Sequence, residues 1–257
     1  MFSLFATYPG AFMVLKHSLI VIAGWGYPAA ALEELGHALA PDVRVVPVSA
    51  RELWLKGRVE HEAGPLSRYA AGLGAFMREQ GDVAAVAGWS LGGMAALELA
   101  ARHPETIGRL ALISSTPKFC SDAGFPCGVT AANVRAMRRG LKRDPARVLA
   151  DFYRLAAEPF DASRAGIPDQ VSAECEELTA GLDYLLRMDL RHWLNSIRIP
   201  VLLAHGHEDR VIPWQAAEYA HRGVSGSRLC LYDGIGHDLP LREPEKLADA
   251  IQEFLSA

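Results

Sequence analysis

The amino-acid sequence predicts an α/β fold in which a mostly parallel central sheet carries helices on both faces. Short, almost wholly apolar runs of strand length alternate with amphipathic runs of helical length. This alternation is typical of parallel strands that crossover helices bury on both sides. The chain has 257 residues, of which 50% are hydrophobic, and this is enough for one large domain with an inserted subdomain.

The first part of the chain supplies most of the expected sheet. Apolar runs predict strands at residues 18–23, 43–48, a short run ending at residue 87, and 109–114. Pro47 places the second strand at an edge or an end of the sheet, because proline cannot donate a ladder hydrogen bond. Helical periodicity follows at residues 28–39, 66–80 and from the third strand to about residue 103. Residues 50–64 are charged and irregular, so we expect no regular element there.

The alternation stops after residue 115 and resumes near residue 199. The intervening segment shows helical patterns at residues 129–142, 145–157 and 169–188 but no convincing strand. A stretch of this length inside an alternating pattern indicates an insertion rather than a loop. We therefore expect a helical cap at residues 116–198, inserted into a core of residues 1–115 and 199–257. The core resumes with strands at 200–204 and 228–232 and helices at 213–222 and 243–255.

The strongest chemical signal lies between the third strand and its helix, in Gly88-Trp89-Ser90-Leu91-Gly92-Gly93. The pattern is G-x-S-x-G, which on a sharp strand-to-helix turn exposes the serine as a nucleophile. Glycines on both sides allow the turn to close, and the helix N-terminus favours negative charge beside the hydroxyl. The alternative is a glycine-rich turn with no chemistry, but the strand and helix that flank the motif favour a catalytic Ser90.

A nucleophilic serine needs a base, and the base needs an orienting carboxylate. Asp209 follows the strand at 200–204, and His237 follows the strand at 228–232. Strand ends deliver both residues to the edge of the sheet where Ser90 is expected, in the chain order Ser, Asp, His. We predict His237 as general base and Asp209 as its carboxylate, with Glu208 and Asp238 as competitors for the latter role.

Hydrolysis also requires two N–H donors for the oxyanion. One should be the amide of Leu91, directly after the nucleophile, and the other the amide of Trp25, in the turn after the first strand. The side chains of both residues would then line the acyl pocket, although ordinary core packing is an equal alternative for the tryptophans Trp25 and Trp89.

Composition excludes several other classes of function. A net charge of −4 gives no electrostatic case for nucleic acid, and no apolar run reaches the ~18–20 residues of a membrane span. The apolar N-terminus lacks a basic region, so we do not expect a signal peptide, and Met13 is a plausible natural start. The cysteines Cys120, Cys127, Cys175 and Cys230 show no paired spacing, which favours free thiols and a cytoplasmic location, although Cys120 and Cys127 could approach each other.

With these residues in view, the chain resembles the α/β-hydrolase fold over essentially its whole length. Within that superfamily it resembles the pimeloyl-carrier-protein methyl ester esterases of biotin synthesis (BioH type). The matching segments are Gly24-Trp25-Gly26, Gly88 to Gly93, Ser114-Ser115-Thr116-Pro117-Lys118-Phe119, and Gly181-Leu182 through Met188-Asp189-Leu190-Arg191. The resemblance implies hydrolysis of the methyl ester of a carrier-bound dicarboxylic half-acid, with no cofactor.

The resemblance further implies that basic cap residues hold an acidic acyl-carrier protein. The inserted region contains a cationic cluster comprising Arg135, Arg138, Arg139, Lys142, Arg143, Arg147 and Arg154. A solvated helix face is the simpler interpretation of such a run, but a basic cap on an otherwise acidic protein would suit that partner.

Other functions remain open from the sequence. The same serine chemistry would serve a general short-chain carboxylesterase or a C–C-bond hydrolase, and a ligand-sensing protein that has lost catalysis would retain the fold. His205-x-His207-x-Asp209 resembles part of the H-x-H-x-D-H zinc motif of metallo-β-lactamase-like hydrolases. Arg210 stands where the last histidine of that motif belongs and no second ligand cluster follows, so we expect no metal.

Overall fold

The computed structural model describes residues 17–39, 43–60, 65–81, 83, 85–161 and 175–257. Its centre is a six-stranded sheet in the order β2-β1-β3-β4-β5-β6, and every neighbouring pair of strands is parallel. The strands are β1 (His17–Ile22), β2 (Val43–Val48), β3 (Ala85–Trp89), β4 (Arg109–Ile113), β5 (Val201–Gly206) and β6 (Arg228–Tyr232). Pro47 lies in edge strand β2, as predicted. The possible start at Met13 and the first residues of the helix expected at 169–188 lie outside the described residues.

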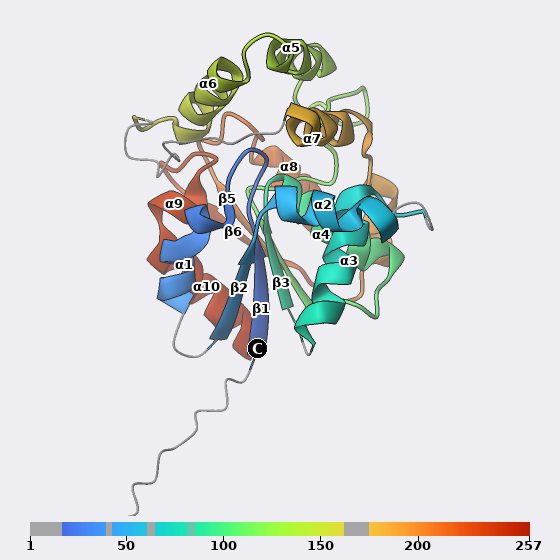
Figure 1. The fold of residues 1–257 in the computed structure, drawn as a ribbon. Helices are drawn as coiled ribbons and strands as arrows, with labels where there is room; N and C mark the ends of the chain where they lie inside the picture. The colour runs from blue at the N-terminus through green and yellow to red at the C-terminus, as the bar shows by residue number, and fades with distance from the viewer. Residues whose placement is uncertain (1–16, 40–42, 61–64, 82, 84, 162–174) are drawn as a thin grey trace, which may run out of the picture.

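Helices cover both faces of this sheet (Figure 1). One face carries α1 (Glu33–Leu39) and α10 (Pro244–Ser256), which pack against Val21 and Ala87. The other carries α3 (Arg68–Gln80), α4 (Leu91–Arg102) and α8 (Gln215–Gly223), which pack against Ile20 and Val86. Successive residues of one strand therefore feed two separate cores, and this explains why the strands are apolar along their whole length. The short elements η1 (Ala29–Leu32), η4 (Arg191–Ser196) and α9 (Leu239–Arg242) connect these layers.

Residues 50–60, which we expected to be irregular, form helix α2 (Ala50–Glu60). Ser49 and Glu52 make a capping box: the Glu52 N–H donates to Ser49 Oγ at 3.2 Å, and the Ser49 N–H donates to Glu52 Oε2 at 2.8 Å. The helix packs closely on α3, where a Cβ at Gly72 would lie 1.9 Å from the carbonyl oxygen of Leu53. Arg68 stacks its guanidinium 3.4 Å above the centre of the Trp54 ring. The charged side chains in and beside this segment thus cap α2 and pack it against α3, instead of marking a loop.

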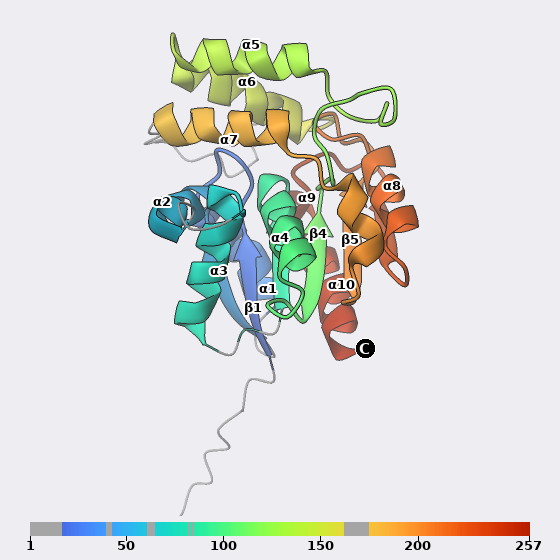
Figure 2. The ribbon, with the colours of Figure 1, turned by 90° about the vertical axis from the view of Figure 1, so that its right-hand side faces the viewer.

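The cap helices lie side by side across the carboxyl ends of the strands (Figure 2). They are α5 (Ala131–Leu141), α6 (Pro145–Ala157) and α7 (Cys175–Arg187). Two chain segments connect the cap helices to the core, and an ion pair joins these segments: Lys118 Nζ lies 2.9 Å from Asp189 Oδ2. Arg191 binds the same carboxylate at 2.7 Å. The expected fold class is confirmed, while the exact limits of the cap, residues 116–198, stay a prediction.

Candidate active site

The turn between β3 and α4 has the geometry that its sequence predicts. Ser90 has φ 55°, in the left-handed region that residues with a side chain rarely adopt. A Cβ at Gly88 would lie 2.5 Å from the backbone nitrogen of Gly93, and one at Gly92 would lie 2.6 Å from Ile22. Only glycine permits the strand and helix to approach this closely, and the strained turn presents Ser90 at the carboxyl edge of the sheet.

His237 lies between Ser90 and Asp209. Its Nε2 is 3.0 Å from Ser90 Oγ, and its Nδ1 is 2.8 Å from Asp209 Oδ2. All three residues are buried. The loops after β5 and β6 therefore bring together the three side chains that the sequence singled out, in a hydrogen-bonded line from carboxylate to hydroxyl.

Asp209 is held in its charged form. Burial alone would raise its pKa, but the charge of His237 and hydrogen bonds from His205 and His237 outweigh burial and hold that pKa well below its usual range. The second carboxylate oxygen accepts the backbone N–H groups of Val211 and Ile212, each at 2.8 Å. A carboxylate with this many donors presents a fixed negative charge to the imidazole.

The competing carboxylates have other environments. Glu208 is exposed. Asp238 is fully buried, but its Oδ2 accepts a hydrogen bond from Arg242 Nε at 2.7 Å. Burial raises the pKa of Asp238 above its usual value. Neither residue replaces Asp209 beside the Nδ1 of His237.

His205 and His207, the candidate metal ligands, contact different partners. The Nε2 of His205 lies 2.8 Å from the carbonyl oxygen of Ile212 and 3.2 Å from Asp209 Oδ2. His207 binds Asp233 at 3.1 Å near the surface. His205 thus supports Asp209, a role that the sequence reasoning missed because it is visible only once β5 and the following turn are folded. Across the described residues, no group of three or more His, Cys, Asp or Glu side chains is arranged around a possible metal position.

The loop that carries Trp25 passes directly beside the serine. A Cβ at Gly24 would lie 3.3 Å from Ser90 Cβ. The amide of Leu91 is the first of α4, so the helix itself offers it no acceptor. The side chains differ from our expectation for Leu91: Trp25 lines the pocket, whereas Leu91 is fully buried in the core.

A cavity of about 390 Å³ opens above Ser90, between the core and the cap. Its walls are mainly apolar side chains of the inserted region, including Phe119, Met137, Val148, Phe152, Leu182 and Leu185. Arg210 and Asp151 also line it and are exposed to solvent. The site therefore combines a buried nucleophile with space for an aliphatic chain.

The predicted docking arginines divide into two groups. Arg138 pairs with Asp183 at 2.6 Å, and both Arg147 and Arg154 pair with Asp151, at 3.8 and 2.9 Å. Arg135, Arg139 and Arg143 are exposed, and they have no ion pair with another described residue. Among the predicted docking arginines, those without such an ion pair therefore lie on α5 and directly after its C-terminal end.

Cys120, Cys127 and Cys230 are free thiols, as expected. Burial raises the pKa of all three. Among the described residues there is no helix with the length and hydrophobicity to cross a membrane.

Comparison with known proteins agrees with this architecture. The model of the alpha/beta hydrolase family matches residues 19–250. The pimeloyl-[acyl-carrier protein] methyl ester esterase of Aromatoleum aromaticum is 36% identical over 194 residues, which are 70% of this chain and 77% of that protein. The esterase of the same name from Neisseria meningitidis serogroup B is 30% identical over 241 residues, 89% of this chain and 83% of that protein.

Solved structures show the same fold. An esterase from Exiguobacterium antarcticum superposes with a TM-score of 0.81 at 23% identity, over 94% of this chain and 92% of that one. A bromoperoxidase from Bacillus anthracis gives the same TM-score at 18% identity, over the same shares of the two chains. The chain belongs to the alpha/beta hydrolase family and, within it, to the family of the pimeloyl-[acyl-carrier protein] methyl ester esterases.

Proposed function

We propose that the protein is a serine esterase that hydrolyses the methyl ester of pimeloyl-[acyl-carrier protein] in biotin synthesis. The observation that carries this proposal is the line from Asp209 through His237 to Ser90, which lies at the base of an apolar cavity. The names of the relatives supply the substrate. The site needs no cofactor for this reaction, because nucleophile, base and oxyanion donors all come from the chain.

Each group then has a defined role. His237 Nε2 accepts the proton of Ser90 as Oγ attacks the ester carbonyl carbon. The amides of Leu91 and Trp25 donate to the resulting oxyanion. As the C–O bond breaks, His237 returns the proton to the leaving methanol, and an acyl-enzyme remains. His237 next removes a proton from water, which attacks the acyl carbon. As the bond between the acyl carbon and Ser90 Oγ breaks, His237 returns that proton to Oγ and the acid is released, while Asp209 holds the Nδ1–H of the imidazole throughout.

The cavity suits the aliphatic part of this substrate. Its apolar walls favour methylene groups, each worth about 0.8 kcal/mol when buried. Ser90 lies on the same cavity as the cap side chains Met137 and Phe152, so a chain bound there would run from the nucleophile toward α5 and α6. The rest of the carrier-bound substrate would leave the cavity beside these helices.

The exposed face of α5 fits the carrier. Arg135, Arg139, Lys142 and Arg143 are exposed, while the chain as a whole has a net charge of −4. A local cationic surface on an acidic protein attracts an acidic partner and raises its rate of association. We place the docking surface on these residues rather than on Arg138, Arg147 and Arg154, which already pair with carboxylates of the same chain.

The test compares methanol release from pimeloyl-carrier-protein methyl ester and from free monomethyl pimelate, at low and moderate salt. We expect a strong preference for the carrier-bound ester that weakens with salt. Arg135→Glu combined with Arg139→Glu should lower kcat/KM for the carrier-bound ester alone. The control is Arg44→Glu, which lies at the amino end of β2, whereas the cap lies across the carboxyl ends of the strands.

Equal kcat/KM values for the two esters would contradict the carrier-bound substrate and favour a general short-chain carboxylesterase. Activity confined to a carbon–carbon bond substrate would favour the C–C-bond hydrolase instead. Cytoplasmic location stays a prediction from the sequence.

A further inference from the structure

We propose that Tyr153, on cap helix α6, is a positioning residue for the oxyanion hole. Through it, α6 fixes the oxyanion loop, residues 24–27, relative to the histidine loop, residues 233–238. The inference rests on the proposed function, because it takes the amide of Trp25 as an oxyanion donor.

The oxyanion loop is a tight turn whose shape depends on Gly26. The Tyr27 N–H donates to the Gly24 carbonyl at 3.2 Å, so that Trp25 and Gly26 are the central residues of the turn. Gly26 has φ +76°, the conformation that a type II turn requires at this position. The Trp25 N–H shares a peptide plane with the Gly24 carbonyl, and the Gly26 carbonyl shares one with the Tyr27 N–H. The turn hydrogen bond from Tyr27 to Gly24 joins these two planes, so the orientation of the Trp25 N–H is linked to that of the Gly26 carbonyl.

Tyr153 holds that backbone from the cap. Its hydroxyl donates a hydrogen bond to the carbonyl oxygen of Gly26. The tyrosine side chain is buried, with 2% of its surface exposed, and burial together with the nearby charge of Glu177 raises its pKa to about 12. The hydroxyl therefore stays protonated at neutral pH and can act as a permanent donor. The Gly26 carbonyl thus accepts its hydrogen bond from a residue of cap helix α6 rather than from a residue of the core.

A second cap helix, α7, fixes the indole of the same loop. Trp25 Nε1 donates to the carbonyl oxygen of Leu178 on α7 at 2.9 Å. A Cβ at Gly181 would lie 2.4 Å from Trp25 Cδ1, so α7 approaches the ring as closely as glycine alone permits. Phe152 of α6 meets the ring edge-to-face, with centroids 5.0 Å apart. The cap therefore holds Trp25 from both α6 and α7.

Helix α6 also contacts the loop that carries the base. The Asp238 N–H donates to the Ala156 carbonyl at 3.2 Å. A Cβ at Gly236 would lie 1.9 Å from the Glu158 carbonyl oxygen. The carboxyl end of α6 thus lies directly against the residues on either side of His237, and one rigid helix contacts both loops.

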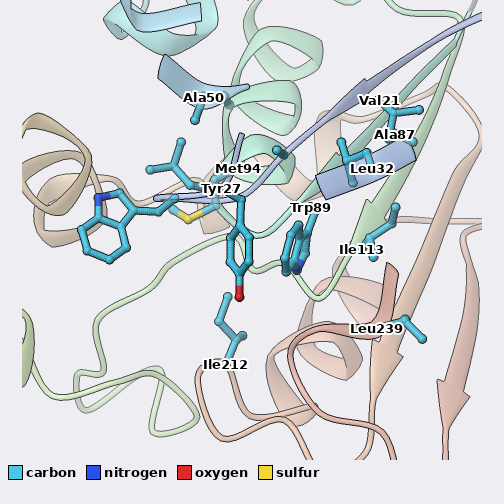
Figure 3. Packing of buried hydrophobic residues seen from close by; sticks show 14 of the residues in the cluster. Val21, Tyr27, Leu32, Ala50, Ala87, Trp89, Met94, Ile113, Ile212 and Leu239 are labelled. Carbon is cyan, nitrogen blue, oxygen red and sulfur yellow. The ribbon is translucent and has the colours of Figure 1, made fainter. Parts of the chain in front are cut away.

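The space between these loops is filled by packed rings. The Tyr27 ring lies between Trp89 and Tyr153, with centroid distances of 4.3 and 4.9 Å, and Figure 3 shows Tyr27 beside Trp89. Trp89 Nε1 in turn donates to the carbonyl oxygen of His237 at 2.9 Å. A displacement of the oxyanion loop would therefore require repacking of both the elbow and α6.

This arrangement predicts a selective defect. Without the Tyr153 hydroxyl, the Gly26 carbonyl loses this hydrogen-bond donor, and the Gly26–Tyr27 peptide is free to rotate toward another donor. That rotation would also move the Tyr27 N–H away from the Gly24 carbonyl, which lies in the same peptide as the Trp25 N–H. The Trp25 amide would then be misaligned with the oxyanion, while the apolar walls that bind the substrate are unchanged. The loss should appear in kcat and leave KM nearly constant, because the oxyanion exists only after the attack.

The test is Tyr153→Phe, with Tyr69→Phe as the matched control. Tyr69 is another buried tyrosine, and its hydroxyl donates to the Glu177 carbonyl of α7 at 3.4 Å rather than to the Gly26 carbonyl. On a neutral methyl ester, we expect Tyr153→Phe to lower kcat roughly ten-fold, less than the ~10²-fold cost of losing an oxyanion donor outright. Inhibition by a trifluoromethyl ketone, whose adduct with Ser90 carries an oxyanion, should weaken by the same factor. Tyr69→Phe should leave both quantities within about two-fold of the wild type, at a similar cost in melting temperature.

A kcat and an inhibition constant for Tyr153→Phe equal to those of Tyr69→Phe would overturn the inference and leave the esterase proposal intact. Failure of the proposed function is recognised separately, on the wild type, by the absence of ester hydrolysis that depends on Ser90, and it would also remove the inference. If Tyr153→Phe does not fold, Tyr153→Met provides a second test, because its flexible side chain fills the same space without a donor for the Gly26 carbonyl. We expect the same fall in kcat at constant KM, and an unchanged kcat would refute the inference.

Discussion

Replacement of Asp209 by asparagine tests the role of the carboxylate with almost no change of shape. The Oδ1 of Asp209 accepts two backbone N–H groups, those of Val211 and Ile212, at 2.8 Å each. Both are donors, so the amide oxygen of asparagine must take this position. Its NH₂ group is then forced to face His237 Nδ1, which lies 2.8 Å from the present Oδ2.

That orientation changes the tautomer of the base. With a donor facing it, Nδ1 of His237 must become an acceptor, and the ring proton moves to Nε2. Nε2 is the atom 3.0 Å from Ser90 Oγ, so the imidazole can no longer accept the serine proton. A wrong tautomer of this kind costs about 10⁴-fold in kcat in a serine protease. At 1.36 kcal/mol for each factor of ten, the expected loss is about 5 kcal/mol of transition-state stabilisation.

The assay is steady-state hydrolysis of a methyl ester, with kcat and KM measured separately between pH 6 and pH 9. We expect kcat to fall about 10⁴-fold with little change in KM. Asp238→Asn is the control, because Asp238 is also a buried acid near His237 but pairs with Arg242, and it should stay within about ten-fold of the wild type. Activity of Asp209→Asn within ten-fold of the wild type would refute the assigned role.

Three further predictions concern stability. The folded-state pKa of Asp209 lies below the unfolded value near 3.9, so its charge stabilises the fold above about pH 4. In denaturant unfolding, the difference in free energy of unfolding between the wild type and Asp209→Asn should therefore shrink as the pH falls below about 4. The guanidinium of Arg191 likewise holds the pKa of Asp189 well below its usual range. Asp189→Asn should therefore lower the free energy of unfolding by about 1 kcal/mol at pH 7 after solvent screening. A loss that persists unchanged below about pH 3 would contradict the ion-pair explanation. Gly88→Ala would force a Cβ to within 2.5 Å of Gly93 and should cost about 3 kcal/mol or more, so a melting temperature equal to that of the wild type would show that the elbow can relax.

The parts of the site that the sequence predicted are those encoded by short local patterns. The elbow around Ser90 needs glycines at fixed offsets, and Asp209 and His237 follow strands whose apolar runs are unmistakable. Parallel strands align their carboxyl ends, so local position was enough to bring these residues together. Pro47 identified the edge strand for the same reason, because one missing N–H has a local consequence.

The parts that the sequence did not reveal depend on contacts between distant segments. The Tyr153 hydroxyl meets Gly26 only because α6 folds across the sheet, and His205 supports Asp209 only within the turn after β5. Arg138 is neutralised by Asp183 of another helix. By contrast, the pairing of Arg147 and Arg154 with Asp151 follows from helical spacing and was readable. Helix α2 was also readable, since Ser49 and Glu52 form a capping box, but the density of charge concealed it.

The central claim is that Ser90 hydrolyses a carrier-bound methyl ester. The most direct measurement is methanol release from pimeloyl-carrier-protein methyl ester by the wild type and by Ser90→Ala at equal concentration. The account predicts turnover by the wild type and a fall of about 10⁶-fold, to the background rate, in the variant. Retention of most of the activity by Ser90→Ala, or no methanol release by the wild type, would contradict it.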